Sequence, residues 1–312
     1  MSAVQNRGIF LTLVAQLDRL ARHNRQGSFR TKARYYEACK RFCAYLAAEY
    51  RLQKLENISG KHLVSYVLYL QDTGKSASTV KTDLAAIRFF HDKMSCPKYT
   101  LPTNSELGVE LERRRFGQFD RTWSGPEFNR LLGKAMAENR DDFILALYLG
   151  RYAGLRIHEC FRIDTAAAEQ ALRENALTVK GKGGKVRTVP IEDERILMML
   201  KRVLAQTERG HKLLVPDGMP TDRAINALEL FIYRYRNEIC DEGSDRRLTF
   251  HGLRHTFAVA SIKSGDDIKT AQESLGHATA AFTLDVYGHF TDDMRSVSAQ
   301  RMEGFITNVL NL

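Results

Sequence analysis

The sequence lacks long apolar runs. No stretch approaches the roughly 18 consecutive apolar residues that a membrane-spanning helix requires. The apolar patch near the N-terminus is interrupted by Gln16, Asp18 and Arg19, and it does not fit a secretory signal peptide. We therefore expect a cytoplasmic protein without a membrane partner.

Paired cysteines and clustered metal ligands are also missing. Cys39 and Cys43 are four residues apart on an expected helix with no second pair, so core packing is favoured over zinc. His158, Glu159 and Cys160 are consecutive and cannot share a helix face, so we expect no metal site. An odd number of scattered cysteines indicates free thiols in a reducing compartment: Cys39, Cys43, Cys96, Cys160 and Cys240.

Positive charge is in excess, but it is unevenly distributed. The 312 residues carry a formal net charge of +10, and the pI near 9.4 suggests a polyanionic partner. Residues 1–120 hold 20 Lys and Arg against 11 Asp and Glu, whereas residues 121–312 hold 27 against 26. The length predicts two domains. We expect the first domain to bind an acidic polymer over a broad surface. We expect the second domain to concentrate its positive charge at one site.

Apolar residues at helical spacing predict four helices in residues 1–95. Their opposite faces carry basic and hydroxyl side chains, which can contact phosphates and base edges of a nucleic acid. A merely solvated face is the alternative interpretation, with about equal weight. The candidate contacts are Arg30, Lys32, Arg34, Lys75, Ser78, Thr79, Lys81 and Arg88.

Residues 96–121 are broken up by prolines and glycines, which predicts a connector with one short helical piece. Its basic run could lie along a phosphate backbone or form a solvated helix end: Arg113, Arg114 and Arg115. Ser124 and Glu127 then form a capping box with Pro126 in the first turn, which predicts the start of a new domain.

Two patterns in the second half carry candidate chemistry. Arg156 and Glu159 stand three residues apart, so the carboxylate can orient the guanidinium toward an anion. Residues 176–180 and 186–190 are rich in β-branched residues and flank a glycine-rich turn, which predicts a hairpin. The turn lacks the G-x-x-x-x-G-K-[ST] pattern of a nucleotide-binding loop. The structure of residues 163–175 is left open, with a short strand region as the expectation.

Residues 249–289 hold a fixed order of polar residues. Thr249 can cap a helix that carries His251 and Arg254 on one face and ends near Gly265. A second helix is predicted over 268–275, and a third short helix over 280–287, which ends at Tyr287. His277 follows directly after the glycine that stops the second helix. Any one of these residues alone would more often be structural.

Together these patterns resemble the signature of the tyrosine recombinases, also called phage-type integrases and including Xer- and Cre-like enzymes. That signature reads H-x-L-R-H-T, then L-G-H, then a tyrosine nine or ten residues later. Here these segments begin at His251 and Leu275, and Tyr287 follows ten residues after the histidine of L-G-H. G-L-R-x-x-E begins at Gly154, and G-K-G-x-K-x-R begins at Gly181. Ala153 and His158 depart from the family pattern without removing a catalytic group.

The resemblance implies a mainly α fold with a small β-sheet. A helical SAM-like core-binding domain, residues 1–95, would be joined by a linker, residues 96–121, to a tyrosine-recombinase α+β catalytic domain, residues 122–312. A final helix over 292–312 would dock on a neighbouring protomer or pack on its own domain.

The resemblance also implies a site-specific recombinase that needs no metal, ATP or other cofactor. Tyr287 would attack the scissile phosphate and form a 3′-phosphotyrosyl bond, and strands would exchange through a Holliday junction. The other groups carried over are a phosphate clamp, a general acid, two histidines and a bracing carboxylate: Arg156, Arg254, Lys182, His251, His277 and Glu159. Lys185 is the alternative to Lys182 as the general acid.

Such an enzyme would bind double-stranded DNA with a paired core site in the nucleoid. It would be a monomer or dimer off DNA and a homotetramer on two sites, with accessory DNA-bending proteins as an option. Integration or excision of a mobile element and resolution of a replicon both fit. The alternatives are a type IB topoisomerase-like enzyme and a catalytically inactive DNA-binding protein of the same fold. The filled signature positions argue against the inactive protein, and the small helical N-terminal domain argues against the topoisomerase.

Overall fold

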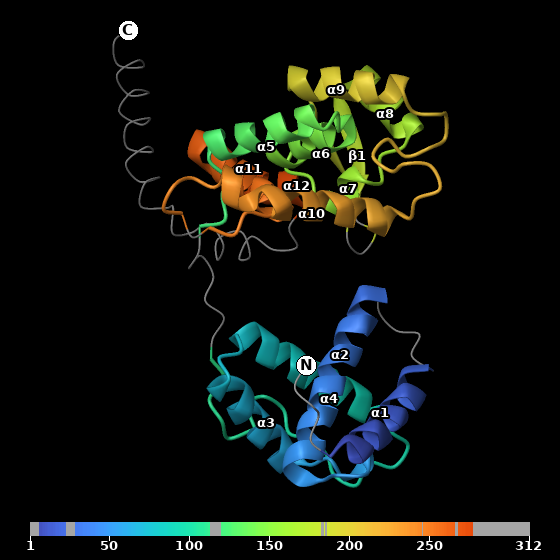
Figure 1. Ribbon diagram of the computed structural model, residues 1–312, viewed down its shortest axis with the longest axis vertical. Helices are drawn as coiled ribbons and strands as arrows, with labels where there is room; N and C mark the ends of the chain where they lie inside the picture. Colours follow the sequence, from blue (N-terminus) through green and yellow to red (C-terminus); the bar gives the residue numbers. More distant parts are fainter. Residues whose placement is uncertain are drawn as a thin grey trace. The chain divides into compact units, whose positions relative to one another are not determined.

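The computed structural model describes residues 6–22, 29–112, 120–181, 184, 186–244, 246–265 and 268–276. The chain divides into two compact units, residues 1–115 and 116–312 (Figure 1). The described part is mostly helical and holds one two-stranded sheet, which confirms the mainly α class with a small β-sheet. None of the described helices combines the length and apolar content that crossing a membrane requires.

Four α-helices build the described part of the first unit, as the apolar spacing predicted. Ser59 and Ser76 begin the third and fourth helices, and the Ser76 hydroxyl accepts a hydrogen bond from the Thr79 amide. A π-helical turn extends the second helix, and a short 3₁₀ turn follows it. The bounds are α1 (Arg7–Arg22), α2 (Phe29–Tyr45), the π turn (Leu46–Tyr50), the 3₁₀ turn (Leu55–Asn57), α3 (Gly60–Asp72) and α4 (Ala77–His91).

The core of the first unit is mostly apolar, and its buried polar side chains include one carboxylate, Asp83, in addition to the rings of His62 and His91. Cys39 and Cys43 lie buried in it, as their helical spacing predicted. Asp83 is 1% exposed and accepts hydrogen bonds from the Tyr66 hydroxyl at 3.0 Å and from Arg41 Nη2 at 2.7 Å. These donors satisfy a charge that would otherwise be costly to bury.

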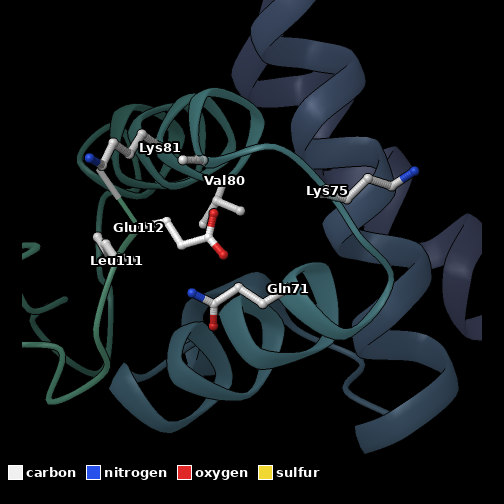
Figure 2. Close-up of a pocket in the computed structure, with 7 residues that line it drawn as sticks. Gln71, Lys75, Val80, Lys81, Leu111 and Glu112 are labelled. Atoms are coloured by element: carbon white, nitrogen blue, oxygen red, sulfur yellow. The ribbon is translucent and has the colours of Figure 1, made fainter. Parts of the chain in front are cut away.

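The described residues of the predicted connector pack on the first unit rather than standing free. Leu107 is 4% exposed within the core of that unit, and Gln71 Nε2 donates to the Glu110 carbonyl at 2.9 Å. Residues 96–112 contain turns and no helix. Figure 2 shows Gln71 and Glu112 directed into a shallow hollow between α3, α4 and this segment.

The second unit surrounds a buried helix. All residues from Phe143 to Gly150 of α6 (Asp141–Tyr152) are buried, and α6 is covered by α5 (Gly125–Ala137), α9 (Glu194–Ala205) and α11 (Phe250–Ser264). The remaining elements are α7 (Ile157–Cys160), α8 (Thr165–Glu174), α10 (Thr221–Ile239), α12 (Ile268–Leu275), β1 (Ala176–Lys180) and β2 (Val186–Pro190). This core positions α7, α11 and α12 against one another.

The predicted hairpin is present. Strands β1 and β2 pair antiparallel, with Ala176 opposite Pro190 and Lys180 opposite Val186. The segment before it differs from the expected short strand region, because residues 165–174 form α8. The Asp164 carboxylate caps this helix through the Ala167 amide at 2.8 Å. Its alanine-rich middle favours a helix.

Candidate active site

Helix α11 places the first two signature residues on its opening turns. The Thr249 hydroxyl accepts a hydrogen bond from the Gly252 amide at 3.3 Å, which confirms the predicted N-cap. His251 is exposed, whereas Arg254 is 1% exposed. The helix ends at Gly265, where the backbone is left-handed with φ of 101°.

Glu159 is the electrostatic centre of the described site. Its carboxylate accepts hydrogen bonds from Arg156 Nη1 at 2.9 Å and from Arg187 Nη1 and Nη2, both at 2.8 Å. It also accepts the Arg156 amide at 2.9 Å. Burial alone would raise the pKa of Glu159, but the bonds from Arg187 and Arg156 outweigh burial and lower it to about 2. The carboxylate therefore stays ionised and fixes both guanidinium groups.

Three arginines converge on three successive backbone carbonyls at the end of α12. Arg187 Nε donates to the Ser274 carbonyl at 3.1 Å. Arg254 Nη2 donates to the Leu275 carbonyl, and Arg156 Nη2 donates to the Gly276 carbonyl at 3.1 Å. The carbonyl end of a helix carries partial negative charge, so three cations stabilise it there. This end of α12 comes directly before His277 in the chain.

Glycines allow the close packing that this convergence needs. Gly154 has φ of +61°, and a Cβ there would lie 2.5 Å from Phe257 Cδ1. The Gly154 carbonyl accepts a hydrogen bond from Arg254 Nη1 at 2.5 Å. Gly276 has φ of +59° and would place a Cβ 3.1 Å from Arg187 Cδ. Both glycines therefore have a steric reason to stand in their motifs.

Arg156 and Arg254, the two arginines of the predicted phosphate clamp, differ in their access to solvent. The Arg156 side chain is 31% exposed, whereas Arg254 is sealed between the Gly154 and Leu275 carbonyls. Arg156 is therefore the guanidinium of this pair that faces solvent, and Arg254 braces the segments around it.

His251 stands in a positive field. Desolvation of its ring by neighbouring protein, followed by the charges of Arg254, Arg156 and Arg121, lowers its pKa to about 4. The residue is nevertheless exposed at the surface, so the ring keeps access to solvent on one side. At neutral pH His251 is uncharged and can accept a proton.

A short segment before α5 packs against the start of α11. Trp123 is 2% exposed; its backbone amide donates to Thr256 Oγ1 at 2.8 Å, and its Nε1 donates to the Thr249 carbonyl at 3.0 Å. A Cβ on Gly252 would lie 2.5 Å from the Arg121 carbonyl oxygen. Residues 120–123 therefore hold the turn of α11 that carries His251.

Several predicted site residues lie outside the described residues. They include the nucleophile, the second histidine, both candidate general acids and the basic run of the connector: Tyr287, His277, Lys182, Lys185, Arg113, Arg114 and Arg115. The predicted helices over 280–287 and 292–312 lie outside them as well. The structure thus brings together Arg156, Glu159, His251 and Arg254.

The predicted DNA contacts of the first unit occupy different environments. Arg34 is exposed and reaches Thr82 Oγ1 at 3.3 Å, whereas Arg88 donates to the Pro102 carbonyl at 2.8 Å and to Asn104 Oδ1 at 2.7 Å. Figure 2 shows Lys75 and Lys81 directed away from the hollow. Lys32, Ser78 and Thr79 are half-buried on α2 and α4, and Arg30 lies on α2, where its side chain is outside the described part.

Arg187 is a site residue to which the sequence pattern assigned no role. It stands at the last position of the G-K-G-x-K-x-R segment, on strand β2, with a side chain that is 13% exposed. The sequence shows the arginine only as the last residue of that segment. Its partner could not be identified from spacing, because Glu159 lies 28 residues away.

One cluster of possible metal ligands occurs in the described part of the chain. Glu208, His211 and Asp217 each offer a ligand atom within 4.8 Å of the others, and all three are exposed. His211 Nδ1 lies 2.5 Å from Asp217 Oδ1, so an ordinary ion pair accounts for most of this cluster.

Comparison with known sequences gives one family over most of the chain. The sequence profile of the phage integrase family matches residues 127–294, and that of the phage integrase N-terminal SAM-like domain matches residues 16–94. The tyrosine recombinase XerD of Halalkalibacterium halodurans is 25% identical over 277 residues, covering 85% of this chain and 89% of that protein. XerC of Chlamydia caviae is 27% identical over 235 residues, covering 72% and 71%.

Solved structures share the fold. The Tn1549 transposon integrase in complex with transposon right end DNA superposes with a TM-score of 0.62 at 17% identity, covering 93% of this chain and 99% of that one. XerH bound to a palindromic difH substrate gives 0.62 at 19% identity, covering 97% and 91%. A lambda integrase dimer bound to a COC′ core site gives 0.63 at 18% identity, covering 86% and 93%. These likenesses confirm the predicted SAM-like and tyrosine-recombinase fold.

Proposed function

The chain belongs to the phage integrase family and is a site-specific DNA recombinase, and we propose that Tyr287 is the nucleophile that cuts and rejoins its DNA. The observation that carries this proposal is the convergence of Arg156, Arg187 and Arg254 on the last carbonyls before His277. Three sequence motifs that are far apart in the chain therefore meet at the end of α12, next to the position expected for the scissile phosphate.

The reaction divides among groups that this chain supplies. The Tyr287 oxygen attacks the scissile phosphorus, the bond to the 5′-oxygen breaks, and a 3′-phosphotyrosyl bond forms. A free tyrosine has a pKa of about 10, so it needs a proton acceptor at neutral pH. His251 is uncharged there and takes that role. Lys182, with Lys185 as the alternative, donates a proton to the leaving 5′-oxygen.

The remaining groups stabilise negative charge on the phosphate. Arg156, whose side chain is partly exposed, donates from its guanidinium to the phosphate. Arg254 is buried and holds the backbone segments around Arg156 in place. Bidentate arginine donors are suited to the non-bridging oxygens and need no metal. His277 adds a hydrogen bond, and Glu159 holds Arg156 in place. The covalent bond conserves the phosphodiester energy, so a 5′-hydroxyl of a partner strand can reverse the step.

We infer that four copies act on two DNA sites and exchange strands through a Holliday junction, with the protein a monomer or dimer off DNA. Double-stranded DNA with a paired core site is the substrate, in the cytoplasm and at the nucleoid. XerH and lambda integrase are proteins of this fold bound to DNA, which supports the substrate class. Accessory DNA-bending proteins are an optional partner in this proposal.

A nicked duplex tests the chemistry. DNA flanking the protein's own gene is nicked near the expected cut, so that the released fragment diffuses away and the covalent product accumulates. We expect a protein–DNA adduct that survives SDS. Tight binding of the cognate site without any adduct would instead support the inactive DNA-binding protein.

Supercoiled plasmid separates recombination from topoisomerase-like action. A recombinase is expected to join two core sites and to require both of them. Efficient relaxation of plasmids that lack a core site would favour the type IB topoisomerase-like alternative.

A further inference from the structure

A cavity of about 530 Å³ adjoins the described active site, between α7, the end of α10 and the start of α11. Arg156 and His251 line it together with Arg236 and Arg247. Its lining also contains four apolar side chains, Ile157, Ile232, Leu248 and Phe250. Arg156 and His251, which act at the scissile phosphate in the proposed mechanism, therefore line the same cavity as Arg236 and Arg247. The mechanism gives these last two arginines no role.

Arg247 and its sequence neighbour Arg246 differ in their pairing. Arg246 Nη2 bonds the buried Glu127 at 2.8 Å and Asp241 at 3.2 Å, so its charge is used inside the fold. Arg247 is exposed, and no carboxylate of the described residues forms an ion pair with it. Arg247 therefore brings to the cavity lining a positive charge with which no carboxylate of the described residues forms an ion pair.

Arg236 has a similar environment. It is half-buried on the last turn of α10, and its guanidinium lies 4.8 Å from the centre of the Tyr233 ring. Among the described residues it also lacks an ion-paired carboxylate. Glu229 is the acidic residue of the lining, against three arginines. The cavity as a whole therefore favours an anion.

We propose that this cavity is a second phosphate subsite, in which Arg247 and Arg236 bind the phosphate next to the scissile one on the cut strand. The proposal rests on the proposed recombinase function. Successive phosphates advance by about 3.4 Å along the helix axis, so a strand held at Arg156 must place a neighbouring phosphate close by. The apolar side chains of the lining suit the deoxyribose between the two phosphates.

A second anchor would determine which phosphate is cut. Contacts to phosphates set the register of a protein on a duplex without reading its sequence. A strand fixed at two successive phosphates cannot slide, and the scissile phosphorus stays in line with its nucleophile. Arg247 and Arg236 are therefore positioning residues for cleavage.

The salt dependence of DNA binding tests the subsite without any covalent chemistry. The double variant Arg247→Gln, Arg236→Gln should reduce the magnitude of the slope of log K against log salt by about 0.9, because the two arginines together neutralise one phosphate. Each single variant should give part of that reduction. Arg173→Gln is the control, since Arg173 is an exposed residue at the end of α8, which packs on β1 and α9. An unchanged slope in both cavity variants would overturn the proposal.

Neutral phosphates then locate the contact. Methylphosphonate is placed at single positions around the scissile phosphate of a nicked substrate. In the wild type, neutralising the adjacent phosphate should slow adduct formation by about 10-fold or more, and Arg247→Gln should lose little further at that position. Equal losses in both proteins would contradict the assignment. If the wild type forms no adduct, the recombinase chemistry fails, and the salt slopes still decide the subsite.

Discussion

Glu159 connects the arginines of the described site. Its side chain is 2% exposed and ion-pairs with both Arg156 and Arg187, and those two arginines hold the end of α12. The carboxylate thus acts through its partners on the segment that leads to His277. We therefore propose that Glu159 positions these arginines and does not itself contact the phosphate.

Glu159→Gln should keep the shape of this side chain and lose its charge. We expect the free energy of unfolding at neutral pH to fall by about 3 kcal/mol, the lower end of the range for a broken buried ion pair. Cleavage of a nicked substrate should slow by about 10-fold or more. Urea denaturation and adduct kinetics measure the two effects.

Acid provides a control for this variant. The pKa of Glu159 is lowered from 4.5 to about 2, so its contribution to stability is present above pH 4.5 and is lost as the pH falls toward 2. The difference in stability between wild type and Glu159→Gln should therefore shrink over that window. A constant difference would show that the ion pairs are not its source.

His251 should titrate with a pKa of about 4 in the free protein and a higher pKa on DNA, because a phosphate favours the charged ring. The unfolded ring takes up its proton near the ordinary value of 6.5, whereas the folded ring does so only near pH 4. Stability from this group is therefore full above pH 6.5 and is lost as the pH falls toward 4. NMR titration with and without duplex DNA measures the shift. A free-protein pKa near 6.5 would contradict this electrostatic picture.

At the scale of elements, local signals in the sequence predicted most helices well. The Thr249 cap, the Gly265 stop and the run over 268–275 all appear as predicted in α11 and α12. Each depends on interactions within a few residues. The hairpin was predictable for the same reason, since its turn residues and β-branched strands are adjacent in the chain.

Long-range contacts explain what the sequence could not reveal. The Arg187–Glu159 pair joins β2 to α7, and neither residue has a spacing that indicates the other. Leu107 gives no local sign that residues 96–112 pack on the first unit. Residues 163–175 were left open because a short strand region was expected there, although the alanines favour the helix α8 that the structure shows.

The contact between residues 120–123 and α11 makes a glycine testable. Gly252→Ala would place a methyl group 2.5 Å from the Arg121 carbonyl and 2.8 Å from Trp123 Nε1. We expect a loss of about 1–3 kcal/mol of stability, as for an overpacked core. Cleavage should fall with it, because the displaced turn carries His251. Thermal unfolding and adduct yield are the measurements.

Gly133→Ala is the matched control. Gly133 lies within α5, and a Cβ there would meet nothing within 4 Å. The substitution should raise stability by about 0.5–1 kcal/mol through helix propensity and leave cleavage unchanged. If the two variants had similar stability and cleavage, the close contact of Arg121 and Trp123 with α11 would not matter for function.

At the scale of the whole molecule, charge and chemistry are divided along the chain. The excess of Lys and Arg lies in residues 1–120, while residues 121–312 are nearly balanced. The balanced part nevertheless concentrates arginines around α7, α11 and the cavity beside them. We infer that residues 1–95 supply affinity for DNA and that residues 122–312 place one phosphate for cleavage. A linker lies between them in this proposal.

The central claim is that Tyr287 forms the covalent bond to DNA. Nicked substrate is incubated with the protein, the adduct is digested with protease, and the DNA-linked peptide is identified by mass spectrometry. The account predicts a nucleotide on Tyr287, and a Tyr287→Phe protein that binds the same DNA with unchanged affinity but forms no adduct. An adduct on another residue, or a full yield from Tyr287→Phe, would contradict it.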